Sequence, residues 1–340
     1  MAANKYIFFR NDQEQIQFEF DPTDPACLDQ VGYRYFGRVL NLLEPQIKDQ
    51  GLIIYVTGWT VHELPSYGSN VVACILQDEW SREPQYRDKV GMIFRTCGKS
   101  PFVTEAYKYG DWRDVLTNFL AQMKAVLKDG VGRSKMKLVA MQGGKLAPIY
   151  NIPLGYFPLS DVPFVPMKER THDLYFAGSI RHTEEITFFK RPKELARNRM
   201  VEAFDEVKKR IPEIKLKSKI TGGFTESISA DNASYLENMM NAKICPVPRG
   251  NNLETFRFYE AVRYGCIPVA EALPDDYFYN EAPVIRLKNW ADLQVVVTDL
   301  LQDEEKLQDL HQKVLNWWEV KCSESATAKI MSHKIKESMH

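Results

Sequence analysis

Short apolar runs alternate with helix-like segments along most of the 340 residues. In the first half, three such runs lie at residues 51–58, 70–80 and 89–96. Residues 31–47 and 112–130 have helical periodicity, and we expect the second helix to end at Gly130. Apolar runs of this length, separated by helices, are typical of strands buried on both faces of a parallel sheet. The pattern therefore predicts the α/β class.

The alternation stops at residues 157–170, which contain three prolines and resemble an interdomain linker. It then restarts, with apolar runs at residues 173–179, 214–223, 243–248, 266–271 and 282–289. We expect two doubly wound, Rossmann-like domains that face each other across a cleft, with C-terminal helices packing back. The predicted limits are residues 1–160, 170–312 and, for the helical segment, 313–340. In open parallel sheets ligands bind at the carboxyl ends of the strands, so functional residues are sought there.

The overall charge is small, with a net charge of −1 and a pI near 6.6. It gives no general electrostatic reason to expect nucleic acid or an acidic membrane as a partner, so any anion site must be local. No stretch approaches the roughly 20 apolar residues of a membrane span, and no signal peptide is recognisable. The six cysteines form no CxxC pair and no Cys/His metal spacing. These features predict a reduced, cytoplasmic protein without a structural metal.

A candidate anion site follows the run at residues 243–248. The chain turns through Arg249 and Gly250 and enters a helix near Thr255, which is suited to be its N-cap. Free backbone N–H groups at the helix start attract phosphate, and Arg249 and Arg257 can add charge-assisted hydrogen bonds. Glu260, one turn further on, can accept from ribose hydroxyls. The simpler alternative is that Arg257 and Glu260 form an ion pair on a solvated helix face.

Two further loops follow predicted strands of the second domain. In the first, Gly178 permits close approach of a phosphate to the backbone, and Ser179 and Arg181 can donate hydrogen bonds. In the second, we expect Thr221 and Gly222 to lie near a nucleotide base. The alternative for the first loop is a surface turn with a solvated arginine.

Residues 235–272 closely resemble the signature of the exostosin-like glycosyltransferases. A tyrosine-led helix is followed by a small buried strand with Cys-Pro and Arg-Gly, a Phe-Arg-x-Tyr-Glu-Ala helix, and Gly-Cys-Ile-Pro-Val. A second block at residues 173–200 resembles the same family less closely. The resemblance implies a GT-B fold, a nucleotide-sugar donor such as a UDP- or GDP-sugar, and a glycan acceptor. Many family members are anchored in the Golgi membrane, and this sequence shows no such anchor.

The sequence contains no GxGxxG motif and no Asp-x-Asp after a strand for a metal–diphosphate complex. Residues 97–100, CGKS, lack the first glycine of a phosphate-binding P-loop and are followed by proline. We therefore expect neither a metal nor another cofactor, with arginines and a helix N-terminus in place of the cation.

An inverting transferase needs a base from the first domain to take the proton of the acceptor hydroxyl. Asp78 and Glu79 end one apolar run, and His62 follows the preceding run. Each has a structural alternative, because the acidic side chains can cap a turn and a lone histidine is often structural. Two other functions remain open on the sequence. One is a non-catalytic nucleotide- or glycan-binding protein, and the other is a GT-B-like nucleotide-sugar epimerase.

Overall fold

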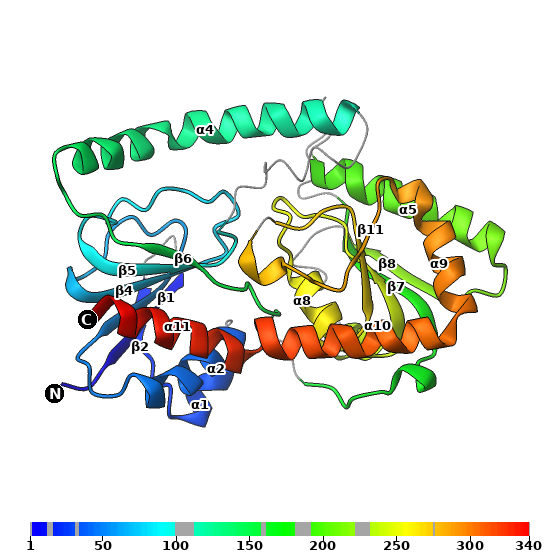
Figure 1. Cartoon of the computed structure of the whole chain (residues 1–340), viewed down its shortest axis with the longest axis horizontal. Coiled ribbons are helices and arrows are strands. Elements are labelled where there is room, and N and C mark those ends of the chain that lie inside the picture. Colours follow the sequence, from blue (N-terminus) through cyan, green and yellow to red (C-terminus); the bar gives the residue numbers. More distant parts are fainter. Residues whose placement is uncertain are drawn as a thin grey trace. The chain divides into compact units, whose positions relative to one another are not determined.

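A computed structural model describes residues 2–11, 16–30, 34–98, 112–157, 161–180, 192–221, 232–274 and 276–339. The chain divides into two compact units, each with its own sheet (Figure 1). Unit 1 comprises residues 1–100, 122–158 and 322–340, and unit 2 comprises residues 101–121 and 159–321. The boundary between residues 158 and 159 falls inside the predicted linker.

The sheet of unit 1 has the strand order β2-β1-β3-β4-β5-β6. Its strands are β1 (Lys5–Asn11), β2 (Ile16–Glu19), β3 (Ile53–Gly58), β4 (Gly68–Leu76), β5 (Val90–Arg95) and β6 (Ile149–Asn151). All neighbours are parallel except the edge strand β2, which is antiparallel to β1. Residues 54–58 of β3 and 71–76 of β4, the two central strands, are buried without interruption, which agrees with the predicted burial on both faces.

The helices of unit 1 come from distant parts of the chain. They are α1 (Pro25–Gln30), α2 (Arg34–Leu43), most of α4 (Trp112–Met141) and α11 (Glu324–Met339). The C-terminal helix α11 packs on α2 and β5. The buried Tyr35 hydroxyl of α2 fixes this return, because it donates to the Cys322 carbonyl oxygen at 2.7 Å.

Unit 2 contains an all-parallel sheet with the order β11-β10-β9-β7-β8. Its strands are β7 (His172–Ser179), β8 (Leu216–Thr221), β9 (Ala242–Pro246), β10 (Ile267–Ala270) and β11 (Ile285–Arg286). After β7 the chain first adds β8 on one side and then β9 on the other. The strand order therefore reverses between β7 and β9, and this is the position where open α/β sheets bind ligands.

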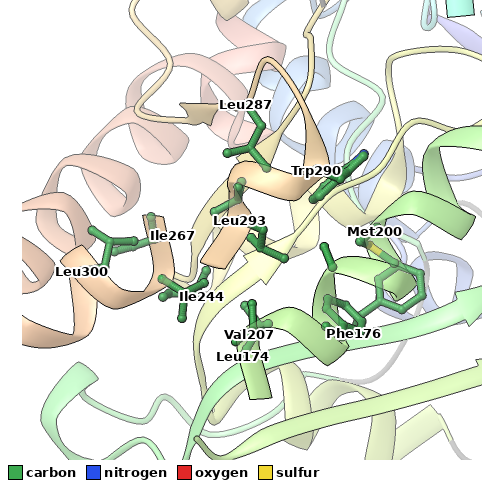
Figure 2. Close-up of a cluster of buried hydrophobic side chains, with 14 of the residues drawn as sticks. Leu174, Phe176, Met200, Val207, Ile244, Ile267, Leu287, Trp290, Leu293 and Leu300 are labelled. Carbon is green, nitrogen blue, oxygen red and sulfur yellow. The ribbon is translucent and has the colours of Figure 1, made fainter. Parts of the chain in front are cut away.

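Helices cover both faces of this sheet. Their bounds are α5 (Pro192–Arg210), α7 (Asn232–Met240), α8 (Phe256–Arg263), α9 (Leu293–Gln302) and α10 (Glu304–Trp317). Leu174 and Phe176 of β7 pack with side chains of α5 and α9 in a buried cluster (Figure 2). Tyr175, between them, points to the other face and contacts the Tyr235 ring of α7 at 6.1 Å between centroids. This alternation makes β7 apolar on both faces.

The predicted α/β class with two parallel-sheet units is confirmed, and so are C-terminal helices that pack back. The structure divides the predicted segment 313–340 between the units, because α10 belongs to unit 2 and α11 to unit 1. The prediction that the helix beginning near residue 112 ends at Gly130 is wrong, since α4 continues to Met141. An ion pair between Asp129 and Arg133 spans the glycine, and Met136 of the added turns is buried. Both compensate the modest helix penalty of a glycine.

Candidate functional site

The carboxyl end of β7 holds a glycine against an arginine of α8. Gly178 has φ +154°, and a Cβ there would lie 2.4 Å from Nη2 of Arg257. Arg257 donates from this nitrogen to the carbonyl oxygen of Ala177, and its guanidinium carbon lies 4.4 Å from the Phe176 ring centroid. Its Nε is buried and has no hydrogen-bond partner among the described residues. A side chain at position 178 would displace this arginine.

Two cations of α5 reach the same strand end. Lys193 and Arg197 are buried, and the Lys193 ammonium lies 3.4 Å from the Ser179 hydroxyl oxygen. Arg197 donates from Nη1 to the Ser179 carbonyl oxygen and from Nε to the Arg249 carbonyl oxygen, the latter at 3.2 Å. Arg197 thus joins the end of β7 to the loop after β9, where the strand order reverses. Lys193, Arg197, Arg249 and Arg257 are called the basic cluster below.

The loop between β9 and α8 is held by its own hydrogen bonds. The Arg249 side chain is buried and donates from Nη2 to the Asn251 carbonyl oxygen at 3.3 Å. The Gly250 N–H donates to the Asn252 carbonyl oxygen at 3.0 Å. The Thr255 hydroxyl accepts from the Phe258 N–H at 3.4 Å, which confirms the predicted N-cap. The start of α8 is therefore fixed beside the basic cluster.

The idea that Arg257 and Glu260 form a solvated pair is wrong for Glu260. This carboxylate is only 4% exposed and accepts from the Tyr235 hydroxyl of α7. Burial raises the pKa of Tyr235 well above its usual value, the Glu260 charge raises it further, and Arg257 opposes the change. Glu260 is thus a buried acceptor at the junction of α7 and α8.

The other predicted residues of unit 2 are placed in part. Thr221 ends β8 and lies opposite Ser179 in the register of the parallel pair. Arg181 and Gly222 lie outside the described residues. No group of three or more His, Cys, Asp or Glu side chains is arranged to hold a metal ion in the part of the chain that the structure describes.

Unit 1 has a cavity of about 510 Å³ at the carboxyl ends of β3 and β4. His62 and Asp78 both line it, so the structure brings two of the three predicted base candidates together. Glu79 is not among the lining residues. Trp59 and the C-terminal half of α4, including Lys135, complete the wall. The cavity therefore combines an aromatic ring with titratable side chains.

Asp78 is only 1% exposed and caps a turn, as its structural alternative predicts. Its Oδ2 accepts from the Arg82 N–H at 2.7 Å, and its Oδ1 accepts from the Trp80 N–H at 3.3 Å. Burial raises the pKa of Asp78, and the nearby Arg95 guanidinium, 4.0 Å away, opposes this shift. His62, by contrast, is exposed to solvent and also lines the cavity. The imidazole is thus the more accessible of the two groups.

Three non-glycine residues in or near this turn are in the left-handed region: Gln77 (φ 60°) precedes Asp78, Ser81 (φ 54°) lies within the turn, and Cys97 (φ 54°) precedes Gly98, which Ser81 contacts. The Gln77 N–H donates to the Thr96 hydroxyl at 2.8 Å, and the Ser81 hydroxyl donates to the Gly98 carbonyl oxygen. Each such conformation costs on the order of 1–3 kcal/mol and tends to persist at functional sites. The strain favours a functional role for this loop cluster.

The sequence interpretation missed three residues of these sites. Trp59, directly after β3, lines the cavity and stacks with Arg82, whose guanidinium carbon is 4.1 Å from the ring centroid. Its position at a strand end was the available signal. Lys193 and Arg197 are four residues apart in the first turns of the helix after β7, and that spacing places both on one helix face.

No protein-family model matches the chain. Part of the chain is similar to exostosin-1 of Bos taurus, with 36% identity over 80 residues that cover 23% of this chain and 10% of the relative. Exostosin-1 of Drosophila melanogaster is 35% identical over 97 residues, which cover 26% and 12%. The predicted resemblance to exostosins is thus confirmed for about a quarter of the chain, and the matched stretch spans about a tenth of the relatives' length.

Among solved structures, the chain is similar to an alpha-glucosyltransferase (AGT) in complex with UDP. The TM-score is 0.44 and the identity 13%, and both chains are covered in full. It is also similar to the pneumococcal O-GlcNAc transferase GtfA in complex with UDP and GlcNAc, with a TM-score of 0.43 and 10% identity over 90% of this chain and 60% of the other.

Proposed function

We propose that this protein is a glycosyltransferase that moves a sugar from a nucleotide-sugar donor to a glycan or glycoconjugate acceptor. The observation that carries the proposal is the basic cluster, which gathers four cationic residues where the strand order of unit 2 reverses. Such a position favours a phosphorylated ligand in open α/β sheets. The partial similarity to exostosin-1 supports sugar transfer as the class of reaction.

In this proposal the basic cluster binds the donor diphosphate. Negative charge grows on the leaving phosphate as the sugar departs, so a fixed guanidinium such as Arg257 stabilises the transition state more than the ground state. The buried Nε of Arg257 is an available donor for a phosphate oxygen. Because the cluster itself supplies positive charge, we propose that no metal ion is needed. For Glu260 we keep the predicted role of accepting from the ribose hydroxyls, which would fall to its Oε1, because Oε2 already accepts from Tyr235.

Isothermal titration calorimetry with UDP and GDP, in the presence and absence of EDTA, tests this donor site. We expect one of the two nucleotides to bind equally well in both conditions. At a hundredfold excess over Kd it should raise the free energy of unfolding by about 2.7 kcal/mol. Arg257→Ala should weaken binding and lower kcat by roughly 10²–10³-fold, with partial rescue by lysine, which lacks the planar fork.

Arg263→Ala on the same helix is the matched control. Arg263 forms an ion pair with the half-exposed Asp161 at 2.6 Å, so its loss should leave nucleotide affinity unchanged. Failure of both nucleotides to bind would contradict the donor site. Binding only with Mg²⁺ or Mn²⁺ would contradict the metal-free proposal alone.

For the base of an inverting reaction we propose His62. It is exposed and lines the cavity, whereas both carboxylate oxygens of Asp78 already accept backbone N–H groups. With water as the acceptor, His62→Ala should lower the rate of donor hydrolysis by roughly 10²–10⁴-fold without changing donor affinity. Asp78→Asn should mainly lower the free energy of unfolding, because it weakens the hydrogen bonds of the turn. An unchanged hydrolysis rate in His62→Ala would exclude the histidine, and binding of donor without any turnover would favour a non-catalytic binding protein.

A further inference from the structure

Helix α4 carries an apolar face that is exposed to solvent. Its members are 37% to 74% exposed, and they are Trp112, Val115, Leu116, Phe119, Leu120, Met123, Val126 and Leu127. At about 100° per residue these positions share one arc of roughly 140°. This set is called the α4 apolar face.

The opposite side of α4 is the side that contacts its own unit. Met136 is 3% exposed, and Asp129 accepts from the Glu83 N–H at 3.2 Å through its Oδ1. Both residues, together with Gly132, line the cavity of unit 1. Amphipathic helices of globular proteins normally turn the apolar stripe toward the core. In residues 122–141, the part of α4 that belongs to unit 1, this orientation is reversed, so packing within the described residues of unit 1 does not account for the exposed apolar side chains there.

The charge of α4 identifies a suitable occupant. The helix has six basic residues and two acidic residues, a net charge of +4 in a chain whose total is −1. Lys124 and Lys135 are exposed at one edge of the α4 apolar face and Arg133 at the other, and Lys137 is exposed within the same arc, beyond the C-terminal end of the face. A helix with aromatic and aliphatic residues on one face and flanking cations suits an anionic lipid surface.

We propose that α4 binds an anionic membrane surface, with the α4 apolar face in the headgroup region and the lysines against the lipid charges. No helix in the described ranges has the length and hydropathy to cross a bilayer, so the contact is interfacial. A second copy of this chain is a poorer occupant. A twofold interface places the same patch against itself, which would bring two helices of charge +4 together.

Flotation with phosphatidylcholine vesicles, with and without phosphatidylglycerol, tests the proposal. The protein should float only with the anionic vesicles, and high salt should weaken binding because the Debye length falls from about 10 Å at 0.1 M to 3 Å at 1 M. Phe119→Glu/Leu127→Glu should lower the partition coefficient by roughly tenfold or more. The matched control is Val295→Glu/Val320→Glu in unit 2, where the side chains are 52% and 59% exposed, and it should bind normally.

A second variant addresses the charges. Lys124→Glu/Lys135→Glu/Lys137→Glu should lower binding to the anionic vesicles by roughly tenfold or more, while Lys208→Glu on the exposed side of α5 should not. Absence of binding to anionic vesicles, or equal binding to phosphatidylcholine alone, would overturn the proposal. So would sedimentation that shows a wild-type dimer which Phe119→Glu/Leu127→Glu converts to a monomer, because the α4 apolar face would then be a self-interface.

Discussion

Gly178 leaves the space that the Arg257 guanidinium occupies at the end of β7. The same guanidinium stacks on Phe176 and donates to the Ala177 carbonyl oxygen, so three consecutive residues of the strand position it. At φ +154° a larger residue is strained in addition. At the scale of single residues, the donor site therefore depends on a missing side chain as much as on the charged ones.

Gly178→Ala should weaken nucleotide binding by moving Arg257, since the new Cβ would lie 2.4 Å from Nη2. If the glycine acts only through the arginine, the effects on Kd should not add. The double variant Gly178→Ala/Arg257→Ala should then bind no more weakly than Arg257→Ala. Calorimetric titration of the two single variants and the double variant with the same nucleotide measures this cycle. Strictly additive losses would show that Gly178 serves the site independently of Arg257.

At the scale of elements, α4 differs most from its prediction. It runs through Gly130 and Gly132, and a Cβ at position 130 would meet no atom within 4 Å. Gly130 therefore destabilises the helix only through the conformational entropy that glycine loses on folding, which is the cause of its weak helix propensity. Tertiary contacts of Asp129 and Met136 outweigh it.

Gly130→Ala should raise the free energy of unfolding by about 0.5–1 kcal/mol, because it adds helix propensity without a clash. Gly155→Ala is the contrasting change. Gly155 has φ +73°, and a Cβ there would lie 2.1 Å from the buried Tyr35 ring, so this variant should be clearly destabilised. Urea unfolding followed by circular dichroism measures both. A destabilised Gly130→Ala protein would mean that α4 packs more tightly around residue 130 than the structure shows.

At the scale of the whole molecule, positive charge is concentrated in two separate places. The net charge of −1 excludes a general attraction to anions, yet the chain holds a basic cluster in unit 2 and a helix of charge +4 at residues 112–141. The basic cluster lies where the strand order of unit 2 reverses, and the cations of α4 lie beside an exposed apolar face. Two distinct anionic ligands, a nucleotide and a lipid surface, are therefore compatible with a nearly neutral chain.

The sequence by itself determined the features that depend on neighbours along the chain. The period of apolar residues located β3, β4, β5 and most strands of unit 2, and local chemistry identified Thr255 as an N-cap. Arg249 and Arg257 were found because they flank that cap. Strand β1 and its neighbour, the edge strand β2, were not predicted, since the apolar run of β1 is only four residues long, between Lys5 and Arg10, and β2 is itself only four residues long.

Only the tertiary structure decided which residues, distant in the sequence, contact each other. Strand order places the loop after β9 beside the end of β7, so that Arg197 donates to both Ser179 and Arg249, although Arg197 and Arg249 are 52 residues apart. It also buries Glu260 under Tyr235 and Asp78 inside a turn, while α4 turns its apolar face outward. Periodicity shows that a helix or strand has two different faces. Which face meets the protein depends on contacts between distant segments, and those are set by the packing of the whole chain.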